Sequence, residues 1–63
     1  MSSSRAEMSS VATAIEELAA RLDRMGRDRL SADEQALADE LFGAEAALTG
    51  VVRRLRRMVD IVA

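Results

Sequence analysis

The chain has 63 residues and a net charge of −2, and it contains no Cys, His, Pro, Trp or Tyr. A chain of this length forms one domain at most, and such a domain buries only roughly 60% of its unfolded surface. Without Cys there is neither a disulfide nor a thiolate nucleophile. Without His the usual general base and the commonest metal ligand are missing. We therefore expect no enzyme activity, no metal and no cofactor.

Ala, Leu, Val and Met supply most of the 49% hydrophobic content, and Phe42 is the only aromatic residue. Together with abundant Glu and Arg, this composition predicts an all-α fold. No apolar run approaches the ~20 residues that cross a bilayer, and no signal peptide is recognisable, so we expect a cytoplasmic protein. All nine basic residues are Arg, a bias typical of GC-rich bacterial genomes, which indicates a bacterial origin.

The first half of the chain predicts a helix over about residues 5–25, after a disordered stretch at residues 1–3. Ser4 and Glu7 have the spacing of a capping box, which satisfies free N–H groups at a helix start. Gly26 stands where a left-handed residue would end the helix. The apolar residues recur in steps of three and four, the a/d pattern of a coiled-coil seam. They are Met8, Val11, Ile15, Leu18, Leu22 and Met25.

A second, longer helix is predicted over about residues 32–62, after a turn at residues 26–31. Ser31 and Glu34 repeat the capping-box spacing at its start. Because the connection is short, the helices should be antiparallel neighbours, so that residues 4–63 form one helical hairpin with its two seams face to face. The second seam consists of Leu37, Leu41, Ala44, Leu48, Val51, Leu55, Met58 and Val62.

A hairpin with helices of unequal length would leave apolar surface in water. If Leu22 aligns with Leu37, the first helix ends near Arg54, and the apolar residues beyond it have no cover from their own chain. Exposed surface of this kind usually marks an interaction site. We therefore predict that the hairpin self-associates into a dimeric four-helix bundle through the second helix. The residues predicted to form this interface are Leu41, Ala44, Ala47, Leu48, Val51, Val52 and Leu55.

The charges of the second helix favour an antiparallel dimer. Its first half, from Asp33 to Glu45, carries five acids and no base, and its second half carries four arginines between Arg53 and Arg57. Two antiparallel copies that cross near Leu48 would place each acidic half beside a basic half. We therefore predict a two-fold homodimer in which, for example, Glu40 lies beside Arg56 of the second copy.

Several features of the sequence can be interpreted in more than one way. The arginines could offset the dipole at a helix C-terminus, pair with acids on a partner chain, or bind nucleic acid or an anionic membrane. Gly43 and Gly50 could be tolerated on a solvent-facing stripe or allow another helix to approach closely. The acids are best explained as a solvated face. The residues that could face a further partner are Phe42, Arg53, Arg54, Arg56, Arg57, Met58, Val59 and Val62.

The sequence therefore predicts a small non-enzymatic interaction module, a dimeric helical adaptor or regulator that presents helix faces to a larger protein. One alternative is a nucleic-acid-associated regulator, such as an antitoxin-like or repressor accessory protein, that uses the arginines at residues 53–57. Another is a peripheral membrane binder that uses the C-terminal segment. Nucleic acid and membrane are the less favoured partners, because the chain is acidic overall and has only one aromatic residue.

Overall fold

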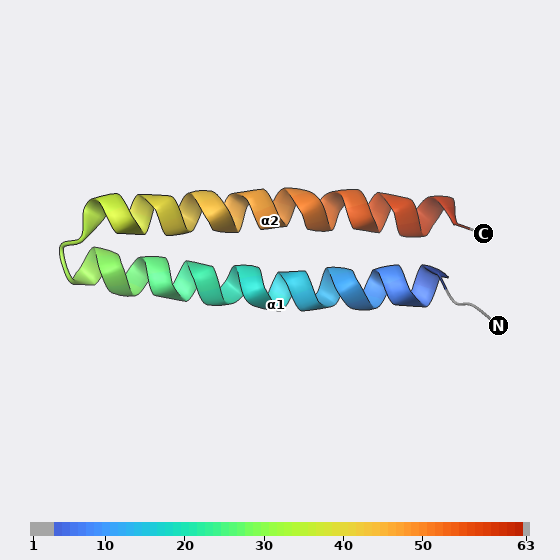
Figure 1. Ribbon diagram of the computed structural model, residues 1–63, viewed down its shortest axis with the longest axis horizontal. Helices are drawn as coiled ribbons and strands as arrows, with labels where there is room; N and C mark the ends of the chain where they lie inside the picture. The colour runs from blue at the N-terminus through green and yellow to red at the C-terminus, as the bar shows by residue number, and fades with distance from the viewer. Residues whose placement is uncertain (1–3, 63) are drawn as a thin grey trace.

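The computed structural model describes residues 4–62, which form two antiparallel α-helices joined by a short connection (Figure 1). α1 comprises Ser4–Ser31 (28 residues), and α2 comprises Gln35–Ile61 (27 residues). The helices lie side by side along the whole hairpin, which measures 50 × 15 × 10 Å between its Cα atoms. The predicted all-α hairpin is therefore confirmed. The stretch at residues 1–3, predicted to be disordered, lies outside the described residues.

α1 does not end at Gly26, where the sequence predicted a C-cap. Gly26 is buried in the interior of this helix, and the ring of Phe42 from α2 lies against it. A Cβ atom added to Gly26 would stand 2.6 Å from Cε1 of Phe42. The absent side chain is what allows the ring to approach, and the packing of the ring offsets the ~1 kcal/mol by which Gly disfavours a helix interior.

α1 ends instead in a Schellman motif just after Ser31. The Glu34 N–H donates to the carbonyl of Arg29 at 2.8 Å, and the Asp33 N–H donates to the carbonyl of Leu30 at 3.0 Å. Asp33 takes the left-handed conformation that this motif requires, with φ 62°. The predicted second capping box does not form, because Ser31 belongs to α1 and Glu34 makes no side-chain cap hydrogen bond.

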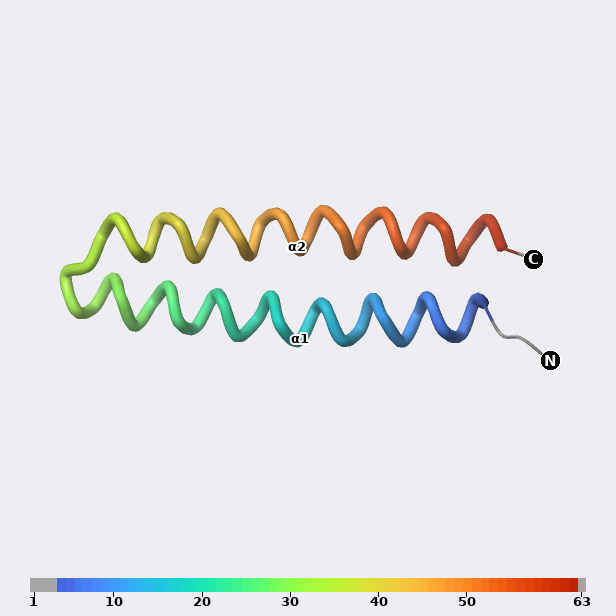
Figure 2. Tube along the Cα trace, in the orientation of Figure 1, coloured from blue at the N-terminus to red at the C-terminus, as the bar shows by residue number. Residues whose placement is uncertain are grey.

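The two helices have nearly equal lengths, so the predicted unequal lengths are wrong. The register follows the contact between Gly26 and Phe42 and not an alignment of the two leucine seams. At the far end, Nη1 of Arg5 donates to the carbonyl of Val62 at 3.4 Å, which ties the start of α1 to the end of α2. The last turns of α2 therefore have α1 beside them, as the Cα trace shows (Figure 2).

The core between the helices consists of small side chains. On α1 the buried residues are Ala12, Ala19 and Gly26, which stand seven apart, and on α2 they are Ala38 and Val52. Within residues 4–62 no large side chain is fully buried. The predicted face-to-face packing of the seams is therefore wrong. The distance between helix axes depends on the side chains at the contact, and rows of Ala and Gly permit a closer approach than rows of Leu.

Candidate interaction surfaces

The apolar residues of the predicted seams lie on one side of the hairpin, largely in contact with solvent. On each helix three large, exposed apolar residues are separated by multiples of seven residues, which places them on one line along the helix. Met25 of α1 lines the same shallow hollow as Leu37 and Leu41 of α2, so the two lines lie on the same side. The six side chains of the two lines are each between 42% and 50% exposed: Val11, Leu18, Met25, Leu37, Val51 and Met58. Leu30 and Ile61 are also exposed, but they lie outside these lines.

Half-buried residues fill the space between these two lines. Ile15 and Leu22 of α1, and Leu41, Leu48 and Leu55 of α2, stand between the exposed residues and the buried rows. Together they make a continuous surface that we call the apolar face. It consists of Val11, Ile15, Leu18, Leu22, Met25, Leu37, Leu41, Ala44, Leu48, Val51, Leu55 and Met58.

Most of the residues predicted to bind a second copy lie on the apolar face or next to it. Ala47 is exposed at its edge. Val52 is the exception, because it is buried between the two helices of its own chain, only 7% exposed, and cannot contact a second copy. The members of the predicted set on the face are Leu41, Ala44, Leu48, Val51 and Leu55.

The heptad pattern of the sequence predicted the α1 half of this face to be the hairpin core. The signal that could have corrected it is the row of small residues Ala12, Ala19 and Gly26, one position after Val11, Leu18 and Met25. Both rows have heptad spacing, and hydrophobicity alone predicts that the more hydrophobic row lies in the interior. The structure buries the smaller row and leaves the larger one about half exposed to solvent.

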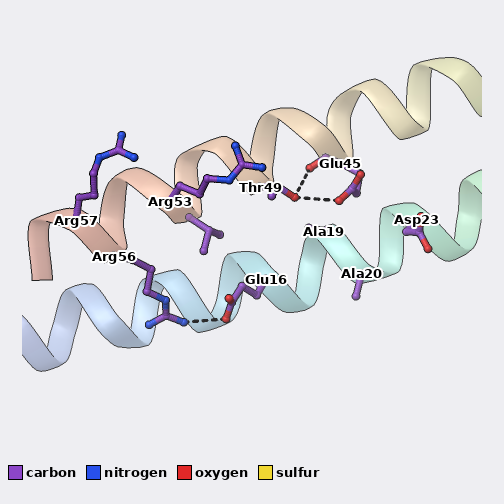
Figure 3. A pocket seen from close by; sticks show the side chains of 10 residues that line it. Glu16, Ala19, Ala20, Asp23, Glu45, Thr49, Arg53, Arg56 and Arg57 are labelled. Carbon is purple, nitrogen blue, oxygen red and sulfur yellow. Dashed lines mark hydrogen bonds and ion pairs between the residues drawn. The ribbon is translucent and has the colours of Figure 1, made fainter. Parts of the chain in front are cut away.

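The opposite side of the hairpin carries a groove of about 720 Å³ whose lining includes charged side chains (Figure 3). Its charged side chains include three acids and three arginines, so neither sign dominates. The Thr49 hydroxyl donates within α2, to the Glu45 carboxylate at 2.9 Å or to the Glu45 carbonyl at 3.0 Å. The groove is lined by Glu16, Ala19, Ala20, Asp23, Glu45, Thr49, Val52, Arg53, Arg56 and Arg57.

The four arginines near the end of α2 do not act as one cluster. Nη2 of Arg56 donates to Oε1 of Glu16 on α1 at 2.8 Å (Figure 3). Nη1 of Arg56 donates to the Ser9 hydroxyl at 3.3 Å. Arg56 therefore joins the two helices, although its side chain stays 40% exposed. Arg53 and Arg57 line the groove without a hydrogen bond or ion pair inside residues 4–62.

Three other residues predicted to face a partner are half-buried within the hairpin itself. Phe42 is half-buried on Gly26, and Val59 is half-buried on the same row of α2 as Val52. Neither therefore forms part of the apolar face. Val62, just past the end of α2, is half-buried beside α1. A Cβ atom added to Gly43 or Gly50 would meet nothing within 4 Å, so the hairpin itself does not use this pair for close packing.

Among residues 4–62, no three acidic side chains are grouped so that they could hold a metal ion. Neither of the helices described is long and apolar enough to cross a membrane. The chain matches no protein-family model, no curated protein and no solved structure.

Proposed function

We propose that the protein is a small, non-enzymatic interaction module whose apolar face binds a second copy. The product is a dimeric four-helix bundle that presents its outer sides to a larger protein. One observation carries this proposal. The buried side chains of the hairpin alone are three alanines and one valine, while the large apolar side chains remain partly in water.

A core this small does not stabilise an isolated hairpin. Chains below roughly 70–80 residues need a disulfide, a metal, a partner or very tight helix packing, and this chain has no Cys and no His. Burying the apolar face would supply the missing hydrophobic stabilisation. Folding and association would then be coupled, as they are in obligate homodimers.

The size and pattern of the apolar face fit a second copy. The broad side of the hairpin measures 50 Å by 15 Å, a footprint of about 750 Å², against about 800 Å² per partner in a standard interface. A two-fold dimer uses the same surface on both chains, so the face has only to complement itself. Its steps of three and four residues are the spacing with which helices pack in left-handed bundles.

The groove side does not favour the alternative functions. Three acids share the groove with the arginines, and Arg56 is already paired with Glu16. A nucleic-acid site would need an uninterrupted basic surface. The outer sides of the bundle are better suited to a protein partner, because they offer charges of both signs.

Size-exclusion chromatography with light scattering tests the proposal on the wild type and on two variants, Leu18→Glu and Val51→Glu. The wild type should elute as a dimer at micromolar concentration. Each variant buries a carboxylate on the apolar face and should be monomeric, with reduced helix content in circular dichroism.

The matched control is Ile61→Glu, since Ile61 is 80% exposed and lies outside the apolar face. This variant should remain dimeric and helical. A wild-type monomer, or equal loss of the dimer in all three variants, would contradict the proposal.

A further inference from the structure

We propose that the two copies stack about a two-fold axis perpendicular to the helices, so that each helix lies antiparallel to its own mate. Leu18 and Leu48 are then the residues nearest to the axis, and Glu40 of each copy pairs with Arg54 of the other. This inference rests on the proposed function, because it specifies how a second copy occupies the apolar face.

Two symmetric arrangements can bury the same face of two hairpins. If the axis is perpendicular to the helices, α1 covers α1 and α2 covers α2 of the second copy. If the axis runs parallel to the helices, α1 covers α2 of the second copy. In both arrangements the facing helices are antiparallel, so helix dipoles do not choose between them, and apolar register and charge must decide.

The apolar register fits the perpendicular axis. The apolar line of α1 is centred on Leu18 and that of α2 on Leu48. Counting back from the contact between Gly26 and Phe42, Leu18 is level with Gly50, two residues from Leu48 and therefore roughly 3 Å along the helix. A single perpendicular axis can thus pass close to both centres. The apolar line of each helix then packs over its whole length against the same line of the second copy, which runs in the opposite direction.

The charges at the outer edge of α2 favour the same axis. Glu40, Ala47 and Arg54 stand seven residues apart, each three residues after a member of the apolar face, which places them along its outer edge. Reversal about the perpendicular axis brings Glu40 of each copy within one helical turn of Arg54 of the other. Neither side chain has a hydrogen bond or ion pair inside residues 4–62, so both are available to a second copy.

The charges disfavour the parallel axis. The corresponding edge of α1 carries Ala14, Arg21 and Asp28. Counting from the contact between Gly26 and Phe42, Asp28 is level with Glu40, so the parallel axis would set two pairs of like charges side by side. Along this edge, the perpendicular axis brings only the two copies of Arg21 near each other. It therefore creates one repulsive pair, against the two attractive pairs between Glu40 and Arg54. The balance of charges therefore selects the perpendicular axis.

Charge reversal followed by sedimentation equilibrium tests this arrangement. Glu40→Arg and Arg54→Glu should each weaken dimerisation by on the order of tenfold, because every single change replaces two opposite-charge pairs by two like-charge pairs. The double variant should recover most of the wild-type affinity. The control Glu17→Arg makes the same change in net charge at an exposed position outside the apolar face, and it should leave the affinity unchanged. Tighter dimerisation of Glu40→Arg than of Glu17→Arg would overturn the perpendicular axis.

Crosslinking provides an independent readout in chains that otherwise lack Cys. Under mild oxidation or with a short linker, the Leu18→Cys and Leu48→Cys variants should each crosslink to their own kind. The Met58→Cys variant, on the same face but far from the axis, should not. If light scattering finds dimers but Leu18→Cys chains crosslink only to Leu48→Cys chains, the axis is wrong while the proposed function stands. If the wild type is a monomer, both fail.

Discussion

Replacing Gly26 by Ala separates the packing of the hairpin from simple helix propensity. In an open helix interior this change stabilises by about 1 kcal/mol, because Gly is the poorer helix former. At Gly26 the new Cβ would lie 2.6 Å from Cε1 and 2.9 Å from Cδ1 of Phe42. Overpacking of this kind typically costs about 1–3 kcal/mol. We therefore expect the Gly26→Ala variant to range from unchanged to about 2 kcal/mol less stable.

The matched control is Gly43→Ala, since an added Cβ there meets nothing within 4 Å, and it should be more stable by about 1 kcal/mol. Thermal unfolding followed by circular dichroism at a fixed protein concentration measures both variants. The Tm of Gly43→Ala should rise by about 4–8 °C, the shift expected per kcal/mol in a domain of this size. In a Phe42→Leu background, which removes Cε1 and Cζ, the loss at Gly26 should shrink. Equal increases in Tm for Gly26→Ala and Gly43→Ala would refute the contact that sets the register.

Three further outcomes are expected. Asp33→Gly should raise the free energy of unfolding by about 0.5–1 kcal/mol, because Gly adopts the left-handed conformation at lower cost, whereas Ala32→Gly should lower it; thermal unfolding of both variants checks this. A double-mutant cycle on Arg56 and Glu16, whose side chains are 40% and 51% exposed, should give a coupling of at most ~1 kcal/mol that declines with salt; a larger, salt-independent value would contradict the exposed geometry. The wild type should bind neither DNA nor RNA near physiological salt, and a salt titration that reveals micromolar binding with a steep slope would reverse this expectation.

The heptad steps of three and four predicted two helices and the residues that share a face, and the short connection predicted their antiparallel order. The heptad steps did not determine which of two adjacent heptad rows is buried inside the hairpin. Ala12 and Val11 belong to rows of the same period, and hydrophobicity alone favours Val11 for the interior. Close approach of two helices favours the smaller residue, and this preference depends on the facing helix, which a single helix pattern does not contain.

The prediction was wrong about the C-terminal end of α1 and about the register for a related reason. Gly26 has the local features of a C-cap, and only its contact with a ring sixteen residues further along the chain keeps it helical. The capping box predicted from Ser31 and Glu34 encloses Asp33, whose left-handed conformation instead ends the first helix. The arginines show the same limit, because the pairing of Arg56 with Glu16 follows from the register. The conformation of Gly26 and the pairing of Arg56 both depend on contacts between the helices, which the local sequence does not specify.

The central claim is that the apolar face of the hairpin is covered by a second copy in solution. The most direct measurement is an isotope-filtered nuclear Overhauser experiment on a mixture of labelled and unlabelled chains, which detects contacts between chains only. A dimer through the apolar face predicts intermolecular contacts to the methyl groups of Val11, Leu18 and Val51, and none to that of Ala20 in the groove. Absence of intermolecular contacts at micromolar to millimolar concentration, or contacts confined to Ala20 and the groove, would contradict it.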